Sequence, residues 1–292
     1  MTQFLQQIIN GLSIGSVYAL VALGYTMVYG IIKLINFAHG EIFMVGAYLA
    51  MILITVFNFP LWAAMLGSMA GSALLGIVIE KVAYKPLRKS SRTAALITAI
   101  GVSFLLQNVM LLIMGARIYT FPQVFQNTAW IVFGLRINTL QIMMFLTSIA
   151  LMILLQFIVL KTKVGRAMRA VAVDKEAAAL MGVDVNNTIS MTFALGSALA
   201  GAAGVMVGLY YISMTPYMGF APGLKAFVAA VFGGIGIIPG AMFGGFAIGI
   251  IETLVAGYGS TLFKDAVVYA ILIIVLLVKP SGLFGKGGKE KV

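Results

Sequence analysis

The chain has 292 residues, of which 62% are hydrophobic and 9% are charged, and its mean hydropathy is +1.08. Soluble domains carry charge on about a quarter of their residues, so this composition excludes a soluble protein and indicates an integral membrane protein. The chain holds no Cys and one His, which excludes disulfides, thiolate chemistry and metal sites built on several histidines.

The net charge of +11 arises from basic residues that gather in three stretches between apolar runs. The stretches are Lys81, Lys85, Arg88, Lys89 and Arg92; Lys161, Lys163, Arg166, Arg169 and Lys175; and Lys279, Lys286, Lys289 and Lys291. Cytoplasmic loops of membrane proteins are enriched in Lys and Arg, so we expect all three stretches in the cytoplasm and no binding of nucleic acid. The first eleven residues hold no Lys or Arg and no cleavage site follows, so we expect the first apolar run to stay in the membrane.

Six apolar runs are long enough to cross a bilayer, which takes roughly 20 residues. The predicted spans are residues 8–29, 40–57, 61–82, 94–115, 139–160 and 188–211. With the basic stretches inside, the N-terminus is predicted to lie outside, and the sixth span ends outside. The loop 116–138 before the fifth span contains Pro122, Trp130 and Arg136, which suits an interfacial segment on the outer face and a landing place for an extracytoplasmic partner.

Residues 223–257 are predicted to form two short helices around a break. The stretch from Gly233 to Gly240 combines four glycines with a proline and cannot continue as regular helix. The residues at the break are Gly233, Gly234, Gly236, Pro239 and Gly240. Broken helices in membranes line a cavity or are covered by protein. The break therefore has two equally supported interpretations, a substrate path and a tight packing elbow between helices.

A last span at about 264–279 then runs to a cytoplasmic C-terminus. The predicted fold class is all-α, a polytopic helical bundle of about eight spans that forms a single transmembrane domain over residues 1–292. Five pairs of glycines four residues apart predict close helix packing within it. The pairs are Gly11 and Gly15, Gly67 and Gly71, Gly204 and Gly208, Gly240 and Gly244, and Gly245 and Gly249.

A polar stretch, residues 161–187, is much longer than a turn between spans requires. Asp174 is predicted to cap a helix from Lys175 to Met181 by accepting from backbone N–H groups near Ala177, and Gly182 is predicted to end it in a left-handed conformation. A helix of two turns is unstable alone in water, so we expect it to persist by packing against another protein.

Ionisable residues at membrane depth are functional candidates by default. Asn36, His39 and Glu41 form the most polar segment against a span; a role in a transport pathway and a simple turn in which Asn36 caps the second span are weighed evenly. Lys225 and Glu252 lie within apolar runs, where they pair with each other or with polar groups of neighbouring helices.

Several motifs resemble known permeases. Glu176-Ala177-Ala178, followed after three residues by Gly182, resembles the EAA loop of ABC-transporter permeases, a cytoplasmic helix that docks on the ATP-hydrolysing subunit; Thr192 and Phe193 stand where that pattern continues with other residues. Four further stretches resemble the LivH-type permease subunit of branched-chain amino acid ABC importers. They are Gly24–Gly30 with Leu34–Glu41, Gly165–Ala170, Gly233–Gly236 with Pro239–Ala241 and Gly244–Gly245, and Lys279–Gly285.

This resemblance implies a permease domain in the bacterial inner membrane that forms half of a translocation pathway for leucine, isoleucine or valine. It implies three kinds of partner besides the lipid bilayer: a second, homologous (LivM-like) permease subunit, two cytoplasmic ABC ATPases, and a periplasmic or lipid-tethered binding protein. The chain has no Walker A pattern, so ATP and Mg²⁺ are expected in the ATPases, and no cofactor or metal is expected on this chain.

The residues expected to couple to the ATPases lie in the loop 161–187. They are Arg166, Arg169, Asp174, Glu176, Ala177, Ala178 and Gly182. The expected translocation path follows the two irregular segments, with Asn36, His39, Glu41, Gly233, Gly234, Gly236, Pro239 and Gly240. No residue is expected to be catalytic.

Three alternatives remain at this point. The same motifs occur in importers of urea, amides or other amino acids. An ATP-independent secondary transporter or channel predicts coupling charges within the spans and no docking helix. An intramembrane hydrolase needs a Ser and a His held together, and His39 is the only histidine.

Overall fold

Helices make up almost all of the regular structure in the computed structural model, which describes residues 1–88, 90–125 and 127–285. Lys89, Lys286, Lys289 and Lys291 of the basic stretches lie outside the described residues. The helices are α1 (Thr2–Ile32), α2 (His39–Thr55), α3 (Leu61–Ile79) with the π-helix η1 (Glu80–Tyr84), α4 (Arg92–Met114), α5 (Thr139–Lys161), α6 (Lys163–Val173), α7 (Lys175–Leu180), α8 (Val185–Tyr211), α9 (Phe220–Gly233), α10 (Ile238–Tyr258) and α11 (Lys264–Val278).

Six helices in the described part of the chain are long and apolar enough to cross a membrane. They are Thr2–Ile32, Leu61–Tyr84, Thr93–Met114, Thr139–Lys161, Val185–Tyr211 and Ile238–Tyr258. The helix α2 is apolar but has 17 residues, and α9 has 14. At 1.5 Å per residue, α2 covers about 26 Å and α9 about 21 Å, less than the roughly 30 Å of hydrocarbon, so the count of about eight spans stays a prediction.

The centre of the bundle is formed by α1 and α8. In their most apolar stretch 83% of residues are buried, against 22% in α4 and α5. All four helices are apolar, so hydropathy alone does not separate them. The inner pair is rich in Gly and Ala, which lets neighbouring backbones approach, whereas α4 and α5 carry large side chains such as Phe104, Leu112 and Phe157 on exposed faces.

The predicted close approach of glycine pairs is confirmed between α1 and α10. A Cβ added to Gly249 would lie 2.4 Å from the Gly15 Cα, and one added to Gly11 would lie 2.5 Å from the Ile250 Cα. Between α8 and α2, a Cβ at Gly204 would lie 2.3 Å from the Phe43 carbonyl oxygen. The absence of a Cβ at these glycines is therefore what allows the backbones of the central helices to touch.

We expect Gly249→Ala to lower the free energy of unfolding by about 1–3 kcal/mol, because the added methyl group meets backbone atoms that cannot rotate away. The measurement is the thermal unfolding midpoint of the purified protein in detergent. Gly101→Ala on α4 is the matched control, since nothing lies within 4 Å of its Cβ position. Equal midpoints for the two variants would contradict this account of the α1–α10 contact.

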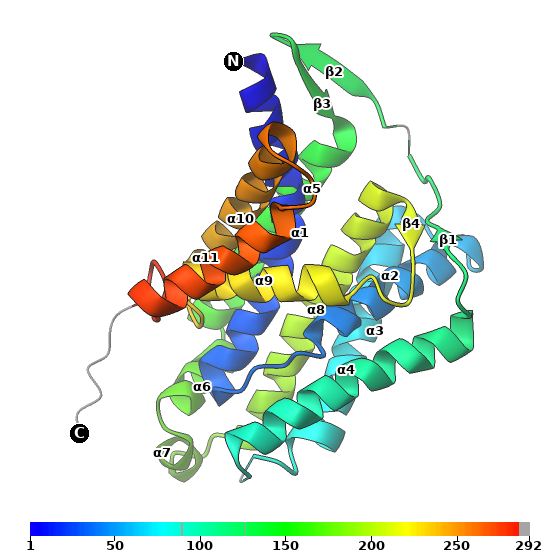
Figure 1. Cartoon of the computed structure of the whole chain (residues 1–292). Helices are drawn as coiled ribbons and strands as arrows, with labels where there is room; N and C mark the ends of the chain where they lie inside the picture. Colours follow the sequence, from blue (N-terminus) through cyan, green and yellow to red (C-terminus); the bar gives the residue numbers. More distant parts are fainter. Residues whose placement is uncertain (89, 126, 286–292) are drawn as a thin grey trace.

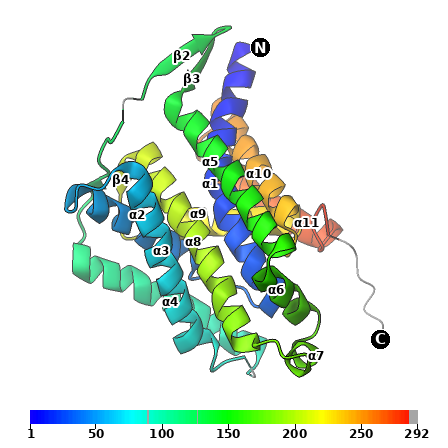
Figure 2. The same ribbon diagram turned by 180° about the vertical axis from the view of Figure 1, so that it is seen from behind.

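The two ends of the molecule differ in structure (Figures 1 and 2). The N-terminus lies at one end with a hairpin of β2 (Ala129–Val132) and β3 (Leu135–Asn138), while α6 and α7 lie at the other. A second small ladder joins β1 (Tyr119–Thr120) to β4 (Ser213–Met214). The hairpin tip is apolar and exposed, with Ile131 and Phe133 outermost, so it suits the interfacial segment predicted for residues 116–138.

The predicted break between α9 and α10 is present at residues 234–237. Gly234 and Gly236 have φ of 111° and 98°, a conformation that side chains rarely adopt. Figure 1 shows α9 running across the steeper α1 and α8. The expectation of two short helices is wrong for the second one: α10 starts at Ile238 and has 21 residues, because Pro239 is tolerated in the first turn of a helix.

The C-terminal segment after α11 closes this break. The amides of Leu283 and Phe284 donate to the carbonyl oxygens of Phe232 and Gly233, at 2.9 and 3.1 Å. These carbonyls end α9 and have no partner within the helix, so the segment supplies bonds that lipid cannot. A Cβ at Gly282 would lie 2.5 Å from the Gly234 Cα, which explains glycine at both positions.

Candidate functional site

The helix α7 has both of the caps that its sequence predicts. Asp174 Oδ1 accepts from the amides of Glu176 and Ala177 at 2.8 and 3.0 Å. At the other end Gly182 has φ of 83°, its amide donates to the Ala179 carbonyl oxygen, and the amide of Val183 donates to the Ala178 carbonyl oxygen, both at 3.0 Å. The helix ends at Leu180, one residue earlier than predicted.

The surface of α7 is unusually apolar for a loop. Ala178 packs inward, while Leu180 and Met181 are 88% and 85% exposed, and Val173 at the end of α6 is 89% exposed. We call Val173, Leu180 and Met181 the α7 patch. Glu176 and Ala177 are also exposed, so the capped helix presents both charge and apolar surface at this end of the molecule.

The helix α6 carries the two arginines of the predicted coupling loop. Its inner face consists of Gly165, Met168 and Val171, and Arg166 lies on the outer face. The exposed Arg169 guanidinium donates to the Val159 carbonyl oxygen at the end of α5. A Cβ at Gly165 would lie 2.2 Å from the same carbonyl, so α6 folds back tightly onto α5 and carries α7 with it.

A buried polar cluster next to α7 was missed by sequence reasoning. The Glu80 side chain in η1 is fully buried, pairs with Arg88, and accepts from the Ser190 hydroxyl at 2.6 Å. Arg88 also donates to Asn186 Oδ1 at 2.7 Å, which ties the first basic stretch to the start of α8. Partial burial and the Arg88 guanidinium lower the pKa of Lys175, the first residue of α7. A single carboxylate within a basic stretch was the available signal.

The predicted path residues Asn36, His39 and Glu41 are all buried. The Asn36 Oδ1 accepts from the Tyr84 hydroxyl at 2.9 Å, and α2 begins after Ala38 without a side-chain cap, so the alternative in which Asn36 caps that helix is wrong. The His39 ring packs edge-on against Tyr25 at 4.9 Å between centroids. A Cβ at Gly24 would lie 2.1 Å from His39 Nε2, so glycine on α1 makes room for the ring.

Glu41 lies in the first turn of α2 and faces α4. Its Oε1 accepts from Gln107 Nε2 at 2.7 Å and from the Ser103 hydroxyl at 3.3 Å. Sequence reasoning found Glu41 but not its two partners, which follow it by more than 60 positions. The side chain is 1% exposed.

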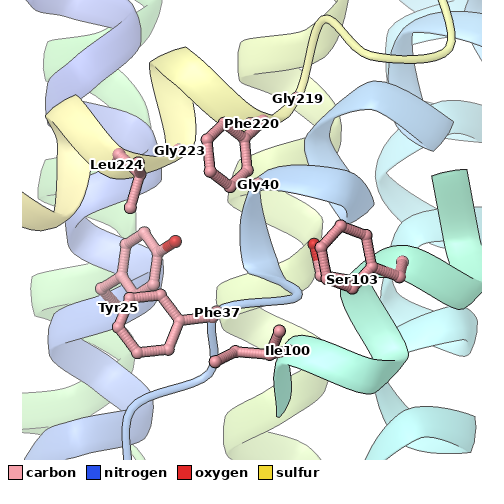
Figure 3. Close-up of a pocket in the computed structure, with 10 residues that line it drawn as sticks. Tyr25, Phe37, Gly40, Ile100, Ser103, Gly219, Phe220, Gly223 and Leu224 are labelled. Carbon is pink, nitrogen blue, oxygen red and sulfur yellow. The ribbon is translucent and has the colours of Figure 1, made fainter. Parts of the chain in front are cut away.

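A cavity of about 300 Å³ lies beside this segment (Figure 3). Aromatic and aliphatic side chains form most of its wall, and backbone of α2 and α9 forms the rest. Its lining includes Tyr25, Phe37, Gly40, Ile100, Ser103, Phe104, Gly219, Phe220, Gly223 and Leu224. The cavity is at the small end of the range of about 300–1,000 Å³ for small-molecule sites.

None of the five predicted path residues at the break is among the residues that line this cavity. A Cβ at Gly233 would lie 1.8 Å from the Gly240 carbonyl oxygen, and Gly234 packs on the C-terminal segment, so these glycines occupy a packing elbow. Pro239 is exposed. Gly236 lines a separate cavity of about 110 Å³ together with Gly30 and Arg169, closer to α6.

Lys225 and Glu252 pair with each other, one of the two arrangements left open by the sequence. The Lys225 Nζ lies 2.7 Å from Glu252 Oε1 and 2.6 Å from Asp265 Oδ1. The Tyr18 hydroxyl donates to Glu252 Oε2 at 2.7 Å, and Lys264 lies 3.6 Å from Glu252 Oε1. This network joins α1, α9, α10 and α11, and it gives both intramembrane charges a structural role.

Comparison with known proteins identifies the family. Residues 7–276 match the family described as branched-chain amino acid transport system / permease component. The chain belongs to this family. It is 45% identical over 302 residues to the high-affinity branched-chain amino acid transport system permease protein LivH of Salmonella typhimurium, covering 99% of this chain and 98% of that protein. The corresponding permease BraD of Pseudomonas aeruginosa is 43% identical over 303 residues, with the same coverage.

A solved structure shares the fold. PsaBC from Streptococcus pneumoniae in complex with Fab matches with a TM-score of 0.50 and 14% identity, covering 95% of this chain and 92% of that one. At this identity the match concerns the fold alone. Together with the apolar helices, family membership makes the chain a permease component and a multi-pass membrane protein.

Proposed function

We propose that the chain is the membrane-spanning permease subunit of an ATP-driven importer of leucine, isoleucine and valine in the bacterial inner membrane. It forms half of the translocation pathway, as a single permease domain over residues 1–292, and a second, homologous permease forms the other half. Two cytoplasmic ATPases bind ATP and Mg²⁺ and supply the energy, and an extracytoplasmic binding protein delivers the amino acid. No reaction is catalysed by this chain.

The observation that supports this proposal best is α7, a six-residue helix capped at both ends with an exposed apolar face. Such a helix gains little from exposure to water, and burial of a Leu side chain contributes about 1.5–3 kcal/mol. We propose residues 161–187 as the coupling loop. Contacts to the ATPases come from Arg166, Arg169, Asp174, Glu176, Ala177, Ala178 and Gly182, together with the α7 patch.

The mechanism follows from how α7 is attached. It is held between α6, which folds back on α5, and α8, which runs through the centre of the bundle. Closure of the ATPase pair on ATP binding displaces α7, and α8 transmits this displacement to α2 and α1, against which it packs.

We place the translocation path along Asn36, His39 and Glu41 and the cavity beside them. The break residues, Gly233 to Gly240, act as the elbow about which α9 and α10 move. Alternating access requires that the ATPases make different contacts with the permease in its outward-open and inward-open states.

The test is to purify the chain from gently solubilised membranes through a C-terminal tag and to identify its partners by mass spectrometry. We expect two further kinds of subunit, a second permease and ATPases, and we expect leucine with its binding protein to stimulate ATP hydrolysis in proteoliposomes. Recovery of this chain alone, in a form that carries solute without ATP, would refute the proposal in favour of a secondary transporter. Stimulation of ATP hydrolysis by urea or an amide, and not by leucine, would show that the importer carries that class of solute in place of branched-chain amino acids.

A further inference from the structure

The Glu41 carboxylate has an unused oxygen at membrane depth. Oε1 accepts from two neutral groups, Gln107 and Ser103, whereas no donor reaches Oε2 among the residues that the structure describes. A buried carboxylate without a charged partner is costly, because neutral hydrogen bonds replace only part of its hydration. By contrast, Glu252 and Glu80 each pair with a basic side chain.

The unused oxygen lies at the edge of the cavity described above. A Cβ at Gly219 would lie 2.7 Å from Glu41 Oε2 and 2.4 Å from the Gly40 carbonyl oxygen, and both glycines line the cavity. Ser103, which donates to the other oxygen, lines it as well (Figure 3). Glu41 Oε2 therefore lies against the backbone of Gly219, a lining residue that carries no side chain.

The cavity and its edge bring together an apolar wall, a buried carboxylate and two helix starts. Phe37, Phe104, Phe220 and Leu224 form an apolar wall. The Glu41 carboxylate is not a lining group, but it lies behind Gly219 at one edge of the cavity. The starts of α2 and α9 meet at Gly40 and Gly219. The amides of His39, Glu41 and Phe220 already donate to carbonyl oxygens that precede them, so the two helix starts contribute their dipoles and not free N–H groups. Such helix starts favour negative groups.

We propose that this cavity binds an amino acid zwitterion with an aliphatic side chain. Glu41 Oε2 receives the ammonium group, the first turns of α2 and α9 face the carboxylate, and the apolar wall holds the side chain. Because Oε2 is covered by the Gly219 backbone in this structure, a small displacement of the start of α9 opens the contact. The inference rests on the proposed function and names the group within it that recognises the charge of the substrate.

The test uses the assembled transporter, this chain with its partner permease and ATPases, in lipid nanodiscs without the binding protein. Binding is measured by saturation-transfer NMR, with empty nanodiscs as background. The probes are L-leucine, 3-methylbutylamine, which lacks the carboxylate, and 4-methylpentanoate, which lacks the ammonium group. We expect 4-methylpentanoate to bind at least tenfold more weakly than leucine, because it leaves Glu41 without its cation.

Glu41→Gln is expected to weaken leucine and 3-methylbutylamine at least tenfold and to leave 4-methylpentanoate unweakened, since the amide keeps the size of the side chain and removes its charge. Glu41→Asp should regain most of the loss. Leucine binding within threefold of the unaltered complex in Glu41→Gln would overturn the proposal, because Glu41 would then serve only to hold α4.

A second variant keeps the proposal testable if Glu41→Gln fails to assemble. Leu224→Trp fills the cavity without a change of charge and is expected to abolish leucine binding, whereas Leu74→Trp on an exposed face of α3 should not. Unchanged binding in Leu224→Trp, or equal binding of the acid and the amine to the unaltered complex, would overturn the proposal.

The outcomes separate this inference from the proposed function. If the unaltered complex does not take up leucine when ATP is supplied, the proposed function itself is refuted. Intact uptake with no effect of Glu41→Gln or Leu224→Trp would refute only the binding site.

Discussion

Lys225→Met is expected to destabilise the protein by about 3–5 kcal/mol, because it leaves Glu252 buried without its counter-charge. The ammonium group of Lys225 lies 2.7 Å from Glu252, and the two side chains are 7% and 4% exposed. The nearby Lys264 is 3.6 Å from the same oxygen but 38% exposed, so it offsets only part of the loss. The measurement is unfolding of the purified chain in detergent, followed by the thermal midpoint.

The double variant Lys225→Met with Glu252→Gln is the decisive control. Replacing both members of a buried pair with neutral residues is often close to neutral, so we expect it to recover most of the stability. Lys163→Met on the exposed face of α6 is the surface control and should change the midpoint little. If Lys225→Met unfolds at the same temperature as the unaltered chain, the network does not hold α9 to α10 and α11.

Leu180→Asp is expected to abolish association with the ATPases while the permease itself still folds. The side chain is 88% exposed in the isolated chain, so its replacement removes no internal contact. In the proposed complex it is buried; loss of about 1.5–3 kcal/mol of apolar burial and the cost of a buried charge together weaken association by at least 100-fold. The measurement is recovery of ATPase subunits with the tagged permease.

Asn187→Asp is the matched control for this variant. It adds the same charge at the same end of the molecule, at an exposed position in the first turn of α8, where a negative charge is favoured by the helix dipole. We expect normal recovery of ATPases and normal uptake. Undiminished recovery of ATPases with Leu180→Asp would remove the α7 patch from the interface.

The sequence by itself determined the features that depend on neighbours within one helical turn or on the length of apolar runs. The bilayer requires about 20 apolar residues for each crossing, so α3, α4, α5 and α8 could be placed within a few residues, whereas α1 begins at Thr2, earlier than predicted, and α10 is longer than predicted. Asp174 and Gly182 cap α7 through bonds to residues at most five positions away, and for that reason their roles were readable. Four glycines and a proline predicted the break after α9 for the same local reason.

Only the tertiary structure decided the contacts between distant segments. Gln107 and Ser103 reach Glu41 across more than 60 residues, and Tyr18 reaches Glu252 across 234. The amides of Leu283 and Phe284 in the C-terminal segment complete the end of α9, a contact that no local pattern indicates. The six long helices are all strongly apolar, so hydropathy carries little signal for which of their faces meet. Packing of glycine against backbone selects them, and this selection places the unused Glu41 oxygen beside a cavity.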